Sequence, residues 1–196
     1  MSFKKYFWLI ITVLVFIIYS PAIGAPLFWD DDDNIVNNTY VKNFDIPAIF
    51  TKNQIAGAGF SSNQYRPILS TSFAIEHALV GNWPVLYHLV NILIHLINGF
   101  LIYKILKLFL KDKLLPYILT AVFLIHPVNT EAVSYIAGRT DLLGLLFLLL
   151  PLFIIFKNKA TKKSLLLINI FFILGILSKE TVVILPAILV FIYFLF

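Results

Sequence analysis

The sequence contains no cysteine and few charged residues, and each shortage excludes a class of protein. Without cysteine the chain has no disulfide, no thiolate metal ligand and no Cys nucleophile. Charged residues make up 13% of the chain, whereas soluble domains contain about 25%. A Walker-type phosphate loop, a G-x-S-x-G elbow and an H-E-x-x-H motif are also missing. The chain therefore lacks the signatures of P-loop proteins, serine hydrolases of the elbow type and zincins.

What the chain has instead is apolar residues, which fill 60% of its 196 positions and include 19 Phe. The mean hydropathy is +0.92. A soluble fold of this size could not hide so much apolar surface, so we expect an integral membrane protein. The net charge of +5 does not indicate nucleic-acid binding, because the Lys residues lie in short clusters beside apolar runs rather than among exposed aromatics.

Six apolar segments predict an all-α membrane bundle with about six spans. The first segment, 6–28, follows Lys4 and Lys5 and is long enough, at about 20 residues, to cross about 30 Å of hydrocarbon. A cleaved signal peptide is the alternative, although residues 23–25 followed by Pro26 make a poor cleavage site. The other five segments are Val85–Leu110, Leu114–Ile125, Leu142–Phe156, Leu165–Leu177 and Val182–Phe196.

Several of these segments are shorter than a full span, so we expect flanking polar residues to extend them, or half-helices packed against neighbours. The last segment reaches Phe196 without a flanking charge. We therefore expect residues 1–196 to be one transmembrane module of a longer protein, with an incomplete bundle. No helical repeat of about 34 residues, the length of a tetratricopeptide repeat, is visible within it.

The charged residues predict an orientation. With the N-terminus in the cytoplasm, the inner face holds Asp112 and ten of the 15 basic residues: Lys4, Lys5, Lys104, Lys107, Lys111, Lys113, Lys157, Lys159, Lys162 and Lys163. The outer face holds Lys42, Lys52, Arg66, Arg139 and Lys179 with nine acids: Asp30, Asp31, Asp32, Asp33, Asp45, Asp141, Glu76, Glu131 and Glu180. Basic residues orient helices and acids contribute little. The outer acids therefore need another reason, and function is a candidate.

An acidic run opens the large first external loop, which we expect to cover about 29–83. Trp29 is followed by four adjacent aspartates, from Asp30 to Asp33. Such carboxylates repel one another, so a divalent cation or a cationic partner would relieve them. Their spacing does not match an EF-hand loop, and the alternative is a solvated acidic loop.

A polar stripe follows at the start of the second span. His88, Asn91, His95 and Asn98 are separated by three, four and three residues, which places them on one helix face. A polar stripe in a membrane helix faces the bundle interior or a wet cavity. Tyr87 and His88 lie near the outer surface and are candidate substrate ligands, whereas hydrogen bonding between helices is the alternative for the whole stripe.

The link at 126–141 carries the third group of polar residues. Pro127 is expected to break the preceding helix. Arg139 and Arg66 are the two arginines in the chain, against 13 lysines. A guanidinium offers a planar fork that suits phosphate, although a salt bridge from Arg139 to Glu131 or Asp141 is the alternative.

A fourth group, Ser178-Lys179-Glu180, returns to the same predicted face, where the alternative is an ordinary loop. Together the four groups supply carboxylates for base or metal chemistry, Arg and Lys for an anion, and His and Tyr for hydrogen bonds. Such a set suits transfer of a group from a lipid-linked phosphate donor within the bilayer.

The motifs resemble a known family. W-D-D-x-x-x-I-x-x-N, Y-R-P, P-x-x-Y-H-x-x-N-x-x-x-H-x-x-N, H-P-V-x-T-E-A-V-x-x-I-x-G-R-x-D-L-L and S-K-E-x-x-x-x-L-P occur in order from Trp29 to Pro186. This order is similar to the transmembrane N-terminal part of the transmembrane and tetratricopeptide-repeat (TMTC) proteins and their bacterial relatives. Those proteins belong to the GT-C superfamily of membrane glycosyltransferases, which includes the protein O-mannosyltransferases.

The resemblance implies transfer of a sugar, with mannose as a candidate, from a polyprenyl- or dolichyl-phosphate donor to a Ser/Thr or other hydroxyl. The acidic motif of GT-C enzymes maps onto Asp30 and Asp31, as catalytic base or as ligands of Mg²⁺ or Mn²⁺. Asp32 and Asp33 leave open which pair acts. The predicted substrate-binding residues are Arg66, Tyr87, His88, His126, Glu131, Arg139, Asp141, Lys179 and Glu180, with Arg139 and Lys179 assigned to the donor phosphate.

Two other function classes compete with the transferase. A small-ion transporter or channel would use the acids as a cation vestibule, but transporters place ionisable groups near the midplane and often show inverted repeats. Here these groups gather at one surface and no repeat is visible, which favours the transferase. A non-catalytic membrane fragment whose polar loops only pack against a partner is the third candidate.

Overall fold

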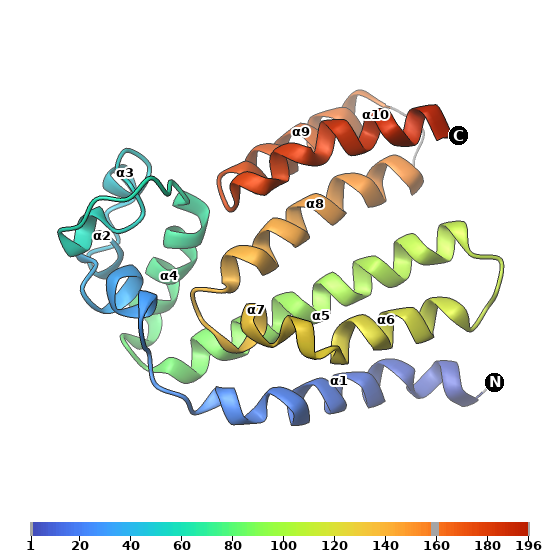
Figure 1. Ribbon diagram of the computed structural model, residues 1–196, viewed down its shortest axis with the longest axis horizontal. Helices are drawn as coiled ribbons and strands as arrows, with labels where there is room; N and C mark the ends of the chain where they lie inside the picture. Colours follow the sequence, from blue (N-terminus) through green and yellow to red (C-terminus); the bar gives the residue numbers. More distant parts are fainter. Residues whose placement is uncertain (1, 158–160, 196) are drawn as a thin grey trace.

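The computed structural model describes residues 2–157 and 161–195, and these ranges contain helices and no strand (Figure 1). Each of the six predicted apolar segments carries a helix: α1 Ser2–Ile23, α5 Pro84–Phe109, α6 Leu115–Ile125, α8 Arg139–Lys157, α9 Lys162–Ile176 and α10 Leu185–Leu195. The predicted all-α membrane bundle is confirmed.

Helix length separates these six helices into two groups. Three are long and apolar enough to cross a membrane, over Tyr6–Ile23, Pro84–Phe109 and Arg139–Lys157. The others are shorter: α6 and α10 have 11 residues each and α9 has 15. At 1.5 Å per residue, 11 residues extend about 17 Å, roughly half of a hydrocarbon core. Three full spans are thus supported by length, and the count of six stays a prediction.

Helix α5 is the centre of the bundle and packs against α1, α6 and α8, while α8 packs against α9. Pro84 opens α5 in its first turn, where a missing N–H costs nothing. Its surface is inverted relative to a soluble helix, because the polar stripe is buried and Leu93, Ile97 and Phe100 point outward. An apolar exterior and a polar interior are what a lipid solvent selects.

The segment between α1 and α5, which is the predicted first external loop, folds into short helices and turns that form a small cap. It contains the π-helical turn η1 Asp32–Val36, α2 Thr39–Lys42, α3 Ile46–Ile49, the 3₁₀ turn η2 Ala56–Ala58 and α4 Pro67–Val80. Asn38 holds it together: its Oδ1 accepts from Tyr40 N at 3.2 Å and its Nδ2 donates to Gln54 O at 3.0 Å. Gly57 makes room, since a Cβ there would lie 2.0 Å from that Oδ1.

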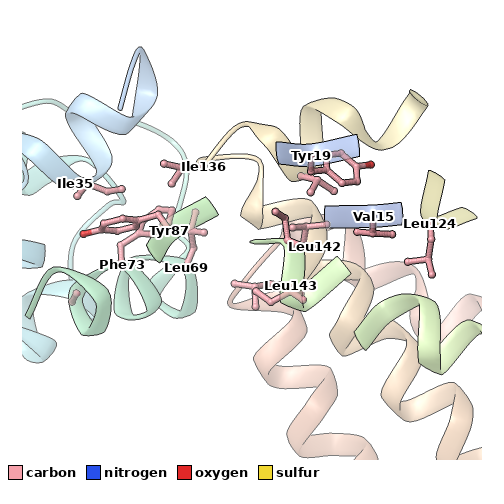
Figure 2. Packing of buried hydrophobic residues seen from close by; sticks show 14 of the residues in the cluster. Val15, Tyr19, Ile35, Leu69, Phe73, Tyr87, Leu124, Ile136, Leu142 and Leu143 are labelled. Carbon is pink, nitrogen blue, oxygen red and sulfur yellow. The ribbon is translucent and has the colours of Figure 1, made fainter. Parts of the chain in front are cut away.

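The cap and the bundle share one apolar core (Figure 2). Tyr87, at the start of α5, is fully buried and lies beside cap residues such as Phe73 and Ile35. Bundle residues including Val15 and Leu142 continue the core along the helices. The cap is therefore packed onto the bundle through the first turns of α5.

The remaining turns lie between α6 and α8 and after α9. They are the 3₁₀ turn η3 Pro127–Asn129, the short helix α7 Thr130–Ser134 and the 3₁₀ turn η4 Glu180–Ile184. As predicted, α6 ends before Pro127. Gly138 allows the tight turn from α7 into α8, because a Cβ there would lie 2.7 Å from Glu131 O.

The two ends of the bundle differ as the sequence predicted (Figure 1). The start of α1, the α5–α6 connection and the end of α8 lie at one end, where the lysine clusters fall. The cap, α7 and the α9–η4 turn lie at the other, with the acids. Lys159 is outside the described residues. Which end faces the cytoplasm stays a prediction.

Candidate functional site

Asp31 is turned into the protein. Trp29 has a positive φ of 55° just before it, and the Asp31 side chain is fully buried. Its Oδ1 accepts from Ala137 N at 3.0 Å and its Oδ2 accepts from Phe28 N at 3.3 Å. Burial raises the pKa of Asp31 to about 6, against the lowering effect of these two N–H groups. Asp31 thus ties the chain leaving α1 to the link between α7 and α8.

Asp30, by contrast, is exposed at the surface. Its backbone N donates to the hydroxyl of Tyr135 at 3.0 Å. Burial raises the pKa of Tyr135 above its ordinary value, so this phenol remains neutral at pH 7. Asp30 and Asp33 line an open cavity of about 380 Å³ together with Gln54. Adjacent aspartates therefore have separate environments, one enclosed and one open to a ligand.

The predicted Mg²⁺ or Mn²⁺ site at Asp30 and Asp31 does not fit this arrangement. Both oxygens of Asp31 accept backbone N–H groups and are shielded from solvent, whereas Asp30 points to the surface. Within residues 2–157 and 161–195, no three His, Asp or Glu side chains converge as a metal site would require. Metal dependence stays a prediction.

Arg139 is fully buried and its guanidinium is occupied by the protein. Nε donates to Asn91 Oδ1 at 2.7 Å, and Nη2 donates to Tyr87 O at 2.9 Å. Nη1 donates to Glu76 Oε2 at 2.7 Å and to Ser72 Oγ at 3.1 Å. These bonds lock the start of α8 to α4 and α5.

This placement differs from both sequence interpretations of Arg139. A donor phosphate has no exposed N–H to reach, because the side chain has no accessible surface. The ion-pair partner is Glu76 rather than Glu131 or Asp141. Sequence reasoning placed Glu76 only among the outer acids, yet it lies among apolar residues of Pro67–Val80. A lone acid in an apolar helix is a signal for a paired, buried charge.

The polar stripe of α5 also bonds inside the bundle. Nε2 of His95 lies 3.0 Å from Leu124 O, and Asn98 Nδ2 donates to Leu142 O at 2.9 Å. The interhelical interpretation therefore describes these residues well. The predicted substrate ligands at the start of α5 are similar: the Tyr87 hydroxyl donates to Gly81 O at 2.8 Å, and His88 is buried beside Ala25 O, 3.3 Å from its Nε2.

Arg66 and Glu180 form a paired fork at the surface. Nε and Nη2 of Arg66 donate to the two carboxylate oxygens of Glu180 at 3.1 and 3.0 Å. The Arg66 side chain is 15% exposed and that of Glu180 is 55% exposed. Because Arg66 precedes α4 and Glu180 begins η4, the pair connects the cap to the turn that follows α9.

The remaining predicted residues border the link between α6 and α8. Lys179 pairs with Asp141, whose side chain is half exposed. Glu131 and Asp141 line a cavity of about 410 Å³ whose walls include His95. His126 is exposed, and its Nδ1 accepts from Val128 N at 3.1 Å, which caps η3.

Apart from His126, which caps η3, the predicted site residues thus fall into four groups, not one. Asp30 lines the open cavity formed by cap residues, Asp31, Arg139, Tyr87 and His88 are buried, and Arg66 pairs with Glu180. Glu131, Asp141 and Lys179 surround the α7–α8 region. Tyr135 lies one helical turn after Glu131, so α7 connects the Asp30 surface to this last group.

The chain is similar in sequence to known membrane enzymes. It is 32% identical over 179 residues to a protein O-mannosyl-transferase of Caenorhabditis elegans, which covers 88% of this chain and 26% of that protein. It is 35% identical over 140 residues to protein O-mannosyl-transferase TMTC1 of Homo sapiens, covering 67% of this chain and 16% of that protein. Identity to Tmtc1 of Drosophila melanogaster is 27% over 178 residues, 88% of this chain and 21% of that protein.

No protein-family model matches the chain, and no solved structure matches it. The chain spans about a quarter of the length of its Caenorhabditis elegans relative. The apolar helices and these similarities together describe a multi-pass membrane protein. This chain is a homologue of the TMTC protein O-mannosyl-transferases, related to them along the segment that it shares with them.

Proposed function

We propose that this chain forms part of a membrane glycosyltransferase. The enzyme moves mannose from a polyprenyl- or dolichyl-phosphate donor to a Ser or Thr hydroxyl of a protein. The relatives are protein O-mannosyl-transferases, which supports the sugar and the acceptor class, and the membrane helices suit a lipid-linked donor. The N-terminus lies in the cytoplasm, and the cap lies on the periplasmic, extracellular or luminal side.

The observation that carries the proposal is the difference in environment between Asp30, which is exposed, and Asp31, which is buried. Asp30 is the accessible carboxylate at the edge of a cavity, and its backbone is held by Tyr135. Asp31 is enclosed and bonds two backbone N–H groups. In this arrangement Asp30 is the general base and Asp31 is a positioning residue.

In this proposal the chain supplies the base for the reaction. The acceptor oxygen attacks C1 of the sugar while Asp30 takes the hydroxyl proton. The bond between C1 and the phosphate oxygen breaks, and its electron pair leaves with the lipid phosphate. The products are the O-mannosyl protein, the lipid phosphate and a protonated Asp30, which returns its proton to solvent.

The test replaces each aspartate by Asn in the full-length protein that contains this chain. Loss of a general base lowers transfer roughly 10²- to 10⁴-fold, so Asp30→Asn is expected to fall by at least about 100-fold. Transfer is measured with a radiolabelled mannosyl-phosphoryl-polyprenol and a Ser/Thr peptide, normalised to the protein in the membrane fraction.

Asp32→Asn is the matched control, because Asp32 is exposed in the same acidic run and its substitution by Asn removes the same charge. It is expected to keep near-normal transfer. Wild-type transfer by Asp30→Asn would contradict the assignment of the base. Equal losses in Asp30→Asn and Asp32→Asn would show that the run acts through its total charge.

A further inference from the structure

We propose that a cavity at the end of the bundle opposite the cap binds an anionic phospholipid. The cavity has a volume of about 500 Å³ and lies between the end of α5 and the start of α6 (Figure 1). The phosphate of the lipid lies among Lys107, Lys111 and Lys113, and its acyl chains lie along the apolar residues beside them. This site is independent of the proposed sugar transfer, because its residues belong to the other end of the bundle from the candidate functional site.

Three lysines and one acid supply the charge of this cavity. Lys107 lies in the last turn of α5, and Lys111 and Lys113 lie in the connection to α6. Together with Asp112 they give the lining a net charge of +2. Like charges around one space repel one another, so a phosphate anion among them relieves this repulsion. Basic pockets between membrane helices bind anionic lipid headgroups in this way.

Asp112 fixes the connection that carries two of these lysines. Its Oδ1 accepts from Leu114 N at 2.6 Å and from Leu115 N at 2.8 Å, so it ties the connection to the first turn of α6. Lys111 and Lys113 flank Asp112 on either side in the sequence. The two cations therefore project from a held backbone, which lowers the entropy that binding an anion costs.

Two tyrosines form an aromatic wall of the cavity. The Tyr103 hydroxyl donates to the Tyr117 hydroxyl at 2.8 Å, and the two ring centroids are 4.7 Å apart. Helix α1 supports both rings: Phe7 lies 4.8 Å from Tyr117, and Trp8 lies 5.4 Å from Tyr103, between ring centroids. Because side chains of three helices build this wall, the shape of the cavity does not depend on the flexible lysines. Tyrosine is also a residue typical of the boundary between membrane and water.

The position of the cavity favours a lipid over a soluble phosphate. Helix α5 is long enough to cross a membrane and ends at Phe109, so residues 110–114 lie where hydrocarbon gives way to headgroups. Leu110 lines the cavity, and the neighbouring residues Leu108, Phe109 and Leu114 are each nearly half exposed. Exposed apolar side chains beside a cationic cavity match a molecule with an anionic head and hydrocarbon chains.

The test measures binding to the full chain in phosphatidylcholine nanodiscs. The probe is a phosphatidylglycerol that carries a diazirine close to its glycerol backbone, used far below saturation, and labelled peptides are identified by mass spectrometry. We expect labels within residues 103–117. Each lysine near an anionic headgroup contributes roughly fivefold in affinity. The triple variant Lys107→Gln, Lys111→Gln, Lys113→Gln should therefore lose at least about tenfold of this labelling.

A second lysine cluster provides the matched control, because lysines beside membrane helices also serve to orient the chain. Lys157, Lys162 and Lys163 lie at the end of α8 and the start of α9, at the same end of the bundle, and none of them is among the described residues that line this cavity. Their joint replacement by Gln removes the same charge. It should lower labelling of residues 103–117 by less than about threefold, since the charge lies farther from the cavity.

A further pair of variants keeps every charge and the orientation of the chain. Leu110→Trp fills part of the cavity and should abolish labelling of residues 103–117. Leu108→Trp places the same side chain at an exposed position near the end of α5 and should label like the wild type. Glycerol 3-phosphate added at millimolar concentration should not compete. Monodisperse elution of each variant shows that it is folded.

Four results would overturn the site. Equal losses in the two triple variants would show that labelling follows the total charge at this end of the bundle. Wild-type labelling of Leu110→Trp would show that the lipid does not enter the cavity. Competition by glycerol 3-phosphate would make the ligand a soluble phosphate rather than a lipid. Labels that fall outside residues 103–117 in the wild type would place the phosphatidylglycerol elsewhere on the bundle.

Discussion

Two cation–carboxylate pairs that include residues of α8 differ in how far they are buried. Arg139 and Glu76 meet in the core, with side chains 0% and 6% exposed. Lys179 and Asp141 meet at the surface, with side chains 22% and 52% exposed. From the sequence, both cations were assigned to a donor phosphate. In the structure Arg139 is buried and bonded to the protein, whereas Lys179 remains accessible to a ligand.

The difference is a matter of how many donors are left over. Four N–H groups of Arg139 are bonded to Asn91, Tyr87, Glu76 and Ser72. A buried guanidinium must be satisfied in this way, since an unpaired charge in a low-dielectric interior is very costly. The Lys179 ammonium bonds one carboxylate and is partly exposed to solvent, so it can bind another anion without leaving a buried group unpaired.

The largest expected effect comes from breaking the buried pair. Arg139→Gln leaves Glu76 buried without its cation, so the free energy of unfolding should fall by about 3–5 kcal/mol. Thermal unfolding in detergent and the amount of folded protein in membranes both measure this. A stable Arg139→Gln protein that had lost only donor binding would instead make Arg139 a ligand. The double variant Arg139→Met with Glu76→Leu should be less damaging than the sum of its parts.

The next largest effect is expected in the pH dependence of the free energy of unfolding, because Asp31 titrates at a different pH in the folded protein. Its folded-state pKa is about 6 against an ordinary value of 3.8, so the folded protein binds this proton more tightly than the unfolded chain. The stability from protonated Asp31 is therefore full below pH 3.8 and is lost as pH rises through 6. The change amounts to about 3 kcal/mol at most. Unfolding measured between pH 4 and 7 should show it.

Asp31→Asn is the control for this pH dependence, because the amide keeps one acceptor oxygen and cannot titrate. Its unfolding free energy should vary less between pH 4 and 7 than that of the wild type. Identical slopes for the two proteins would show that another group titrates in this window.

A smaller effect is expected at the partly exposed fork of Arg66 and Glu180. Arg66→Gln removes two charge-assisted bonds at the surface, and exposed ion pairs contribute about 0.2–1 kcal/mol. The melting temperature should fall only slightly, more at low salt than at high salt. A loss as large as that of Arg139→Gln would mean that the fork, rather than the buried cluster, fastens the cap to the bundle.

The smallest effect on stability is expected for Lys179→Gln. Lys179 makes one bond to its carboxylate where Arg66 makes two, and its side chain is the more exposed of the two cations, so the free energy of unfolding should change by less than about 1 kcal/mol. Sugar transfer by the full-length protein should nevertheless fall, which Arg66→Gln should not cause. A strongly destabilising Lys179→Gln would show that the Lys179–Asp141 pair stabilises the fold as the Arg139–Glu76 pair does, which would contradict the distinction between them.

Much of the fold could be predicted because its signals are local. Apolar runs gave the helices, Pro127 gave the end of α6, and the three–four–three spacing placed His95 and Asn98 on one face of α5. Two features could not be predicted in this way. The folded cap depends on contacts such as that of Asn38 with Gln54, and the role of Glu76 depends on a partner 63 positions away.

The candidate site was only partly predictable. The sequence named Asp30, Asp31, Glu131, Asp141 and Lys179 and placed them at one end of the bundle, which is where they lie. It could not tell that Asp31 is buried while its neighbour Asp30 is exposed, because burial depends on contacts with distant residues such as Ala137. It also could not tell that Gly144 makes room for the stem of Lys179. The catalytic and binding roles of these residues stay predictions, as does the GT-C architecture.

The sequence by itself determined that this protein is a helical membrane bundle with lysines at one end and acids at the other. Solvation dictates these features, since each apolar run and each charge has a favourable environment regardless of its neighbours. The tertiary structure alone decided which charges are structural and which remain for a ligand. That distinction depends on burial and on the number of hydrogen-bond partners, and packing brings those partners from distant parts of the chain.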